Sequence, residues 1–159
     1  MFAVLDCGTT TTRVYIVDEN RSILASGREK VGVRDTAITG SRDTLRSGIT
    51  KLFRETLSTL GLEETDISYV IASGMITSEL GLMEIPHLIA PAGLHELAES
   101  IYEAKSGEVL PIACPVYFIR GIRNDYGADV RAEKLRTVDF MRGEEAQVMG
   151  ILTETENRG

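Results

Sequence analysis

The sequence has few of the features that mark disulfide-rich, membrane-spanning or nucleic-acid-binding proteins. Its two cysteines, Cys7 and Cys114, are too few and too far apart for a disulfide framework or a zinc site. No apolar run approaches the ~18 residues of a membrane span. Lys and Arg total 17 against 24 Asp and Glu, a net charge of −7 without a basic cluster. We therefore expect no nucleic-acid partner and no membrane contact.

The N-terminus also lacks the features of a secretory signal. It has no basic segment, and its apolar run covers only Phe2–Leu5 before Asp6 interrupts it. A cytoplasmic protein with reduced thiols is the expectation. The chain has 159 residues, 43% of them hydrophobic and 26% charged, which is ordinary for one globular domain with a real core.

The first eighteen residues predict two strands joined by a tight polar turn. The apolar run Phe2–Leu5 leads to Asp6, the turn Cys7–Thr12 holds one Gly and four consecutive Thr, and Arg13–Asp18 is rich in β-branched residues. Gly8 lets a ligand approach the backbone, and hydroxyl and N–H donors suit phosphate oxygens. The Asp6 carboxylate is of the type that holds Mg²⁺. A plain hairpin that binds nothing is the alternative.

Further along, spacing and composition predict a third strand over Ser22–Gly27, which makes an antiparallel three-strand meander. The Gly-bounded segment Gly32–Gly40 is expected to be a loop. Ser41–Leu60 is the clearest helix. Its predicted apolar face consists of Leu45, Ile49, Leu52, Phe53, Leu57 and Leu60. Ile67–Ala72 is expected to be a strand buried on both faces, reached by a crossover.

The second half predicts shorter elements. Ser73, Gly74 and Met75 close a strand, and such ends are ligand positions in open α/β sheets. Glu84–Ala92 is expected to be extended because of its prolines, with His87 as a packed residue. A short helix is predicted over Leu94–Lys105, with Leu94, Leu97, Ala98 and Ile101 pointing inward. An irregular segment, Val109–Cys114, and a strand, Val116–Ile119, are expected to follow. Loops are predicted at Asn124–Asp129 and Arg131–Lys134.

The last predicted element is a helix from Gly143 to Leu152, with Asp139 at or just before its start. Asp139, Glu144 and Glu145 place carboxylates near the first turn. Capping and compensation of the helix dipole explain them without any chemistry. A catalytic carboxylate at the helix start is the alternative.

Three blocks of sequence resemble the 2-dehydro-3-deoxygalactonokinase family of the actin-like ATPase and sugar kinase superfamily. They are Asp6-Cys7-Gly8-Thr9-Thr10-Thr11-Thr12-Arg13; Ser73-Gly74-Met75-Ile76 with Ser78, Pro86 and Pro91-Ala92; and Met141-Arg142-Gly143-Glu144-Glu145-x-Gln147-x-x-Gly150. The resemblance implies an α/β actin-like ATPase (ribonuclease H-like) domain. Its mixed sheet would start with the antiparallel meander and carry helices on its faces. The domain would span 1–152, with 153–159 as a tail or the start of a link.

The family phosphorylates 2-dehydro-3-deoxygalactonate with ATP, so a sugar-acid kinase using ATP and Mg²⁺ is the implied function. Cys7 replaces a Trp, Thr11 an Asn, and Glu79 a basic residue of the family pattern, which bears on substrate identity. Family members are roughly twice as long, and no Gly-x-x-x-x-Gly-Lys-Ser/Thr sequence occurs. The chain thus resembles an N-terminal half that would need a C-terminal kinase domain. A non-catalytic actin-like module that binds a sugar acid or a separately encoded partner is the competing interpretation. Self-association into a homo-oligomer is a further expectation.

The resemblance also implies roles for particular residues. Glu144 would be the general base, with Asp139 as second choice, and Asp6 would position Mg²⁺. Arg142 would grip the substrate carboxylate. The nucleotide phosphates would lie against Asp6, Gly8, Thr9, Thr10, Thr11 and Arg13, and the sugar acid against Ser73, Gly74, Met75 and Arg142.

Overall fold

The computed structural model describes residues 1–125 and 139–156. The predicted loop Arg131–Lys134 and most of Asn124–Asp129 lie outside the described residues. Within them, no helix is long and apolar enough to cross a membrane.

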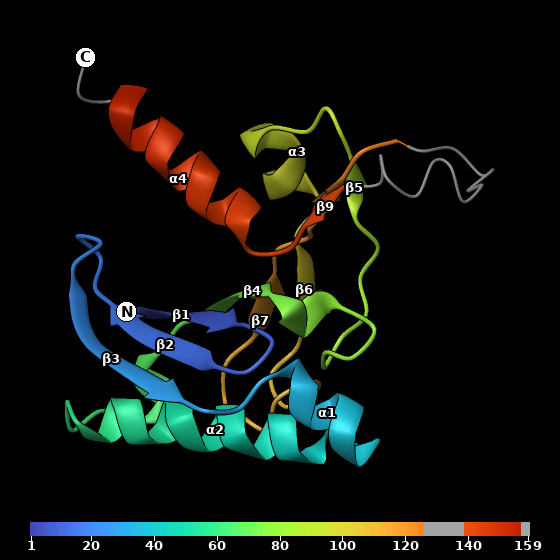
Figure 1. Ribbon diagram of the computed structural model, residues 1–159. Helices are drawn as coiled ribbons and strands as arrows, with labels where there is room; N and C mark the ends of the chain where they lie inside the picture. Colours follow the sequence, from blue (N-terminus) through green and yellow to red (C-terminus); the bar gives the residue numbers. More distant parts are fainter. Residues whose placement is uncertain (126–138, 157–159) are drawn as a thin grey trace.

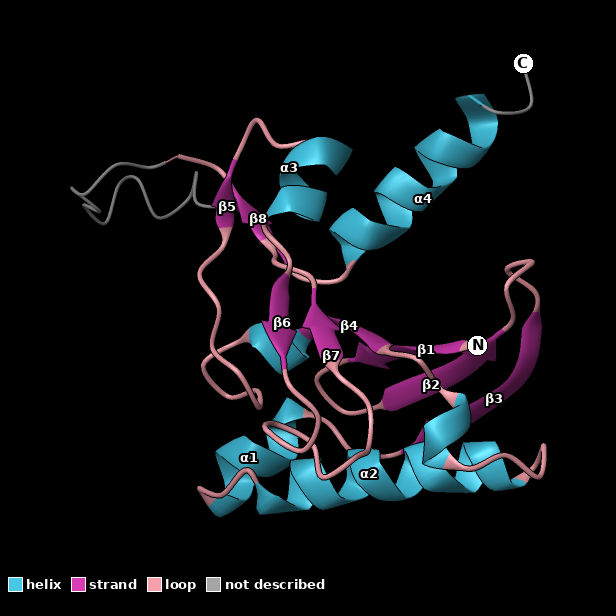
Figure 2. Ribbon diagram, turned by 180° about the vertical axis from the view of Figure 1, so that it is seen from behind, coloured by secondary structure: helices cyan, strands magenta, loops and turns pink. Residues whose placement is uncertain are grey.

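A six-stranded mixed sheet forms the centre of the molecule (Figures 1 and 2). Its strands are β1 (Phe2–Cys7), β2 (Thr12–Val17), β3 (Ile23–Glu29), β4 (Val70–Gly74), β6 (Tyr102–Ala104) and β7 (Val116–Phe118), in the order β3-β2-β1-β4-β7-β6. The predicted antiparallel meander β1–β2–β3 is present, and β1, β4 and β7 run parallel. The carboxyl ends of these three parallel strands therefore meet at one edge of the sheet.

Helices cover both sides of this sheet. Figure 1 shows α1 (Val33–Thr39) and α2 (Asp43–Ser58) along one side, and α3 (Leu94–Glu99) and α4 (Glu144–Glu156) on the other. Short 3-10 turns occur at Glu64–Asp66 and Met75–Thr77. A small second sheet beside α3 pairs β5 (Leu88–Ile89), β8 (Ile122–Arg123) and β9 (Phe140–Met141). The α/β class and the mixed sheet agree with the prediction from sequence.

The core lies between α2 and the sheet. The predicted apolar face of α2 is confirmed at Leu45, Ile49, Leu52, Phe53 and Leu57, all buried, whereas Leu60 lies beyond the helix and is 37% exposed. In β1 the buried side chains alternate, with Leu5 and Cys7 in the core. Since successive side chains of a strand point to opposite faces, Asp6 faces away from α2.

The expected loop Gly32–Gly40 is instead a helix, α1. The Asp35 carboxylate accepts the Gly32 backbone N–H at 2.9 Å and caps the first turn. Gly40 ends the helix in a left-handed conformation with φ of 69°. Gly32 and Gly40, which suggested a loop, are therefore the boundaries of a short helix. Glycine is favoured just past the carboxyl end of a helix, the position that Gly40 occupies.

Three other boundaries differ from prediction. The helix expected over Leu94–Lys105 stops at Glu99, because Tyr102–Ala104 pairs with β7 as an edge strand; of its four predicted inward residues only Leu97 is buried. The strand expected from Ile67 begins at Val70, and its side chains alternate between buried and partly exposed. Helix α4 continues past Leu152 to Glu156.

Candidate active site

A pocket of about 310 Å³ opens at the carboxyl edge of the sheet, where β1 and β4 end beneath the start of α4. Its lining comes from three regions far apart in sequence. They are the end of β1 with the turn after it (Asp6, Cys7, Gly8 and Thr9), the end of β4 with the residue after it (Gly74 and Met75), and the start of α4 with the two residues before it (Arg142, Gly143, Glu144 and Gln147). Asp6 and Glu144, the two predicted key carboxylates, thus share one pocket.

Asp6 is held by its neighbour across the hairpin. Asp6 and Arg13 are paired in the β1–β2 register, and Arg13 Nη1 lies 3.0 Å from Asp6 Oδ2. Ser73 is the register partner of Asp6 on the other side, in β4. The side chains of Asp6 and Arg13 remain 27% and 42% exposed, so this ion pair orients the carboxylate without closing it off from solvent.

The turn after β1 rests on α1. The Gly8 N–H donates to Thr11 O at 2.9 Å, and the Arg34 N–H donates to Thr9 O at 2.9 Å. A Cβ added to Gly32 would come within 2.5 Å of the Thr9 carbonyl, so only glycine permits this approach. Helix α1, which was expected to be a loop, therefore supports the turn that the sequence predicts to bind phosphate.

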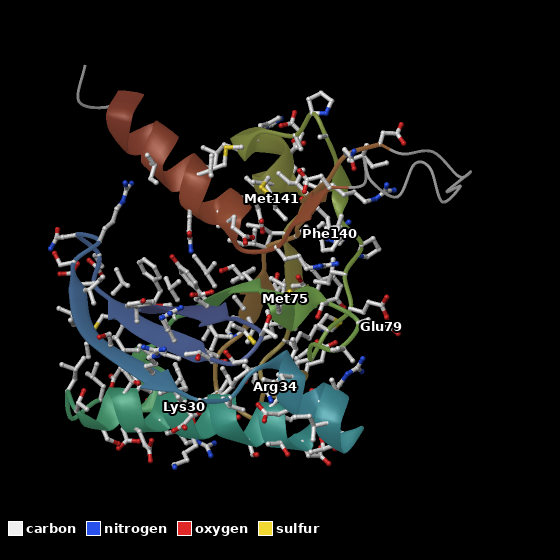
Figure 3. All side chains as sticks on the ribbon, viewed as in Figure 1. Lys30, Arg34, Met75, Glu79, Phe140 and Met141 are labelled. Atoms are coloured by element: carbon white, nitrogen blue, oxygen red, sulfur yellow. The ribbon has the colours of Figure 1, made fainter. Side chains whose placement is uncertain are left out.

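The Thr residues of this turn divide between two sides. Thr9 lines the pocket that holds Asp6, whereas Thr10 and Thr11 line a separate hollow next to α1. Lys30 and Arg34 border that hollow, and Figure 3 shows them on the α1 side of the molecule. The structure hence gathers only part of the predicted nucleotide set around Asp6.

The start of α4 is built by close backbone contacts and two carboxylates. Gly143, with φ of 108°, sits over the end of β4, where an added Cβ would be 3.2 Å from Gly74 Cα. Both carboxylate oxygens of Glu145 accept the Gly143 N–H at 2.8 Å, and Glu145 is only 1% exposed. Burial raises the pKa of Glu145, and the hydrogen bond from Gly143 opposes this. Glu145 therefore acts as an interior cap.

Glu144 has the opposite environment. It is exposed and lines the pocket. Within the part of the chain that the structure describes, it accepts one long hydrogen bond of 3.2 Å, from the Arg142 backbone N–H. Its carboxylate is thus available to a ligand hydroxyl. Asp139, the second candidate base, lines a different pocket beside β8 and β9, and β9 separates it from α4. Of these two candidates, Glu144 shares a pocket with Asp6 and Asp139 does not.

Arg142 is tied into the protein through its guanidinium. Nη1 donates to Thr77 O at 2.8 Å and to Thr77 Oγ1 at 2.6 Å. Nη2 donates to Ile85 O at 3.0 Å and lies 3.2 Å from His87 Nδ1. The predicted grip on a substrate carboxylate stays a prediction, and it would have to displace some of these bonds.

Reasoning from sequence missed several residues of this site. Gln147 lies one turn after Glu144, and that spacing alone would have placed both on one helix face. Thr77 is fully buried and holds Arg142, but nothing in its sequence context signals that contact. Met75 lines the pocket, while Ser73 is the register partner of Asp6 and does not line it.

Comparison with known proteins identifies the family of this chain. The sequence profile described as 2-keto-3-deoxy-galactonokinase matches residues 6–159. The chain belongs to this family.

Two solved structures share the fold. One is provisionally assigned as a 2-dehydro-3-deoxygalactonokinase from Sinorhizobium meliloti, with 22% identity and a TM-score of 0.71 over 98% of this chain and 43% of that one. The other is a reductive activator for a corrinoid, iron-sulfur protein, with 20% identity and a TM-score of 0.50 over 75% of this chain and 22% of that one. No curated protein matches significantly. The galactonokinase-family chain thus spans less than half of the Sinorhizobium protein.

The residues around Asp6 fit a magnesium-nucleotide only in part. Mg²⁺ in phosphoryl-transfer sites takes one or two carboxylates and completes its shell with water and phosphate oxygens. Asp6 supplies one such carboxylate, with Oδ2 on Arg13 and Oδ1 turned toward the end of β4 near Gly74. Among residues 1–125 and 139–156, no group of three His, Cys, Asp or Glu side chains could hold a metal alone. A bound nucleotide would therefore have to contribute ligands.

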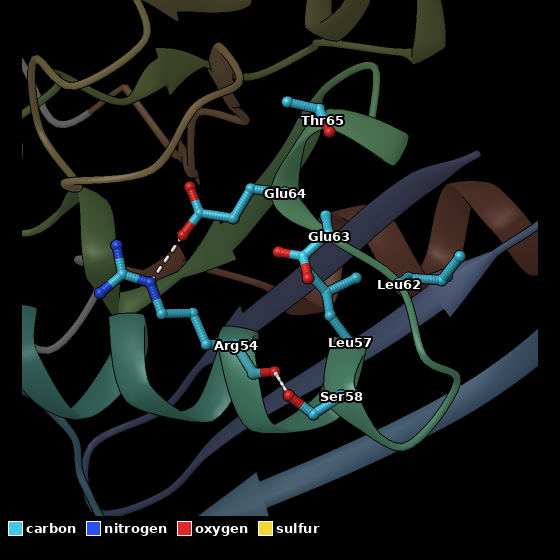
Figure 4. Close-up of a pocket in the computed structure, with 7 residues that line it drawn as sticks. All are labelled: Arg54, Leu57, Ser58, Leu62, Glu63, Glu64 and Thr65. Carbon is cyan, nitrogen blue, oxygen red and sulfur yellow. Dashed lines mark hydrogen bonds and ion pairs between the residues drawn. The ribbon is translucent and has the colours of Figure 1, made fainter.

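A larger groove of about 440 Å³ lies elsewhere, between the end of α2 and the turn before β4 (Figure 4). It is at the amino end of β4, away from Asp6 and Glu144. Arg54 and Glu64 form its ion pair at 2.6 Å, and they also bind Pro111 O and the Ala113 N–H. These bonds fasten the 111–113 segment, so the groove has a structural explanation.

Proposed function

We propose that this galactonokinase-family chain forms the N-terminal half of an ATP-dependent kinase that phosphorylates 2-dehydro-3-deoxygalactonate. The observation that supports this most is the shared pocket of Asp6 and Glu144. It brings a glycine-containing polar turn and an exposed carboxylate together at the carboxyl edge of a parallel sheet, where ligands of such sheets bind.

In this proposal Glu144 accepts the proton of the attacking sugar hydroxyl, whose oxygen bonds to the γ-phosphorus of ATP as the bond to ADP breaks. The backbone and hydroxyls of Gly8 and Thr9 contact the phosphates, with Thr10, Thr11 and Arg13 supporting the turn. Asp6 would hold Mg²⁺, which would neutralise phosphate charge when bound. Gly74 and Met75, which line the pocket, border the sugar acid, and Ser73 lies beside Asp6 in the neighbouring strand.

Because the chain covers 43% of its structural relative, we propose that a C-terminal kinase domain supplies the remaining nucleotide contacts. The isolated chain would then be nearly inactive. We also infer a cytoplasmic location, since ATP is the expected phosphate donor.

The test uses the complete gene product that carries this chain. ADP release is measured with 2-dehydro-3-deoxygalactonate, its gluconate epimer and galactonate, with and without Mg²⁺. Saturable release with one sugar acid, lost in Asp6→Asn or without Mg²⁺, would support the kinase. Saturable binding of a sugar acid without any ADP release would instead identify a binding module. We retain this second candidate function because the chain covers 43% of its structural relative.

A further inference from the structure

The guanidinium of Arg142 has its terminal donors already committed. Arginine carries five N–H groups, four of them on Nη1 and Nη2. Those two nitrogens make four contacts with protein acceptors, on Thr77 twice, on Ile85 and on His87. A bidentate grip on a carboxylate needs two adjacent N–H groups, at least one of them terminal. A substrate could obtain it only by breaking an existing bond.

The acceptors belong to one segment that folds back on itself. Thr77 O accepts the Ile85 N–H at 3.0 Å as well as Arg142 Nη1, and Ile76 O accepts the Met83 N–H at 3.2 Å. The Thr77 hydroxyl, fully buried, donates in turn to Gly74 O at 3.2 Å. A hydrogen-bonded chain therefore runs from Arg142 through Thr77 to the end of β4, on the floor of the pocket.

Arg142 is also joined directly to the start of α4. Its backbone N–H donates to Glu144 Oε2, and Gly143 follows it against Gly74. An added Cβ on Gly121 would lie 2.7 Å from Arg142 Cγ, so the arginine stem is confined as well. Arg142 therefore joins the two walls of the pocket, which are segment 75–87 and the start of α4.

We propose that Arg142 is a positioning residue, which holds segment 75–87 against the start of α4 so that Glu144 and Met75 face each other across the pocket. It acts through protein hydrogen bonds rather than by binding the carboxylate of the sugar acid. The kinetic consequences of this proposal rest on the proposed kinase function. Its structural consequence, that Arg142 holds segment 75–87 in place, does not depend on any activity.

The experiment compares Arg142→Lys with Thr77→Val in the complete gene product. Lysine keeps the positive charge but cannot reach four acceptors. Valine keeps the shape of Thr77 and removes a hydroxyl that is fully buried and does not line the pocket. If Arg142 positions the site, both variants lower kcat by about 10- to 100-fold, the effect of small misplacements, and leave KM for the sugar acid within about threefold. A carboxylate-binding Arg142 would instead raise KM in Arg142→Lys alone and leave Thr77→Val normal, which overturns the proposal.

Amide hydrogen exchange without substrate supplies the second measurement. Losing these bonds should speed exchange in segment 75–87 by roughly tenfold in both variants, with α2 as internal reference. Unchanged exchange in both variants overturns the positioning role. This measurement separates the two proposals. If the protein has no kinase activity, the two variants would still show faster exchange in segment 75–87. If the protein is an active kinase and exchange is unchanged in both variants, Arg142 does not hold that segment.

Discussion

Asp6 and Glu144 line the same pocket, although one lies in the first strand and the other opens the last helix. The parallel pairing of β1 with β4 brings the hairpin turn beside Gly74, and the contact of Gly143 with Gly74 brings α4 over both. These two backbone approaches therefore create the juxtaposition on which the proposed chemistry depends.

Glu144→Gln in the complete gene product should keep the fold and lower kcat by roughly 10²–10⁴-fold, the usual contribution of a general base. The glutamine keeps the size of the side chain and removes its ability to take a proton. Steady-state ADP release measures the rate, and thermal unfolding checks that the fold is intact. Turnover equal to wild type would show that Glu144 is not the base.

Glu145→Gln is the matched control, one residue further along the same helix. Its carboxylate is buried against the Gly143 N–H and does not line the pocket. The amide oxygen of glutamine can still accept that N–H. The rate should therefore fall far less than in Glu144→Gln; an equal loss in both variants would mean that helix geometry, not proton transfer, explains the first result.

Local patterns predicted some of this structure and missed other parts for identifiable reasons. The 3.6-residue periodicity of Leu45 to Leu57 identified α2, because the apolar residues of its buried face recur within a single segment. The edge strand β6 was missed because only its pairing with β7 makes Tyr102–Ala104 a strand. Interactions between distant segments are not visible in a local window.

The site shows the same division. The turn around Gly8 and the carboxylate of Glu144 were recognisable from residue types and family resemblance. The bonds of Arg142 were not, because two of its acceptors are backbone carbonyls, of Thr77 and Ile85, which every residue possesses. Asp139 was placed too near the helix because β9 is only two residues long and too short to predict.

The 159-residue chain alone should bind ATP weakly, because on our proposal much of the nucleotide contact comes from a C-terminal domain. Isothermal titration with Mg-ATP should show no saturation up to about 1 mM, which corresponds to less than ~4 kcal/mol of binding free energy. The complete gene product, titrated in parallel, is the positive control. Tight binding by the 159 residues would mean that the turn after β1 carries the nucleotide site unaided.

Gly74→Ala should destabilise the chain strongly. Gly74 has φ of 87° and ψ of −151°, a region open almost only to glycine, and an added Cβ would lie 2.5 Å from Cys7 O. Strain and overpacking together predict a loss of roughly 2–4 kcal/mol in the free energy of unfolding, measured by urea denaturation. Gly40→Ala is the control, since φ is 69° there but nothing lies within 4 Å. A loss no greater than that of Gly40→Ala would contradict the close backbone contact.

The stability of the chain should also depend on His87 at mildly acidic pH. Arginine only donates hydrogen bonds, so Arg142 Nη2 requires His87 Nδ1 as an acceptor and the imidazole must be neutral. Burial lowers the pKa of His87 below its ordinary 6.5, and the positive charges of Arg142 and Arg123 lower it further. The unfolded chain then binds the proton more readily than the folded one. Stability due to His87 is therefore fully present above about pH 6.5 and is lost as the pH falls through the lower folded pKa.

His87→Asn isolates this contribution, because the asparagine oxygen can accept from Arg142 but does not titrate. Thermal unfolding of both proteins between pH 7.5 and 5 should show the wild type losing stability relative to the variant as the pH falls. Other groups, including Glu145 with its raised pKa, titrate in both proteins and cancel in the difference. A pH-independent difference between the two curves would show that His87 is not held neutral by Arg142, and the hydrogen bond between them would then have to be reassigned.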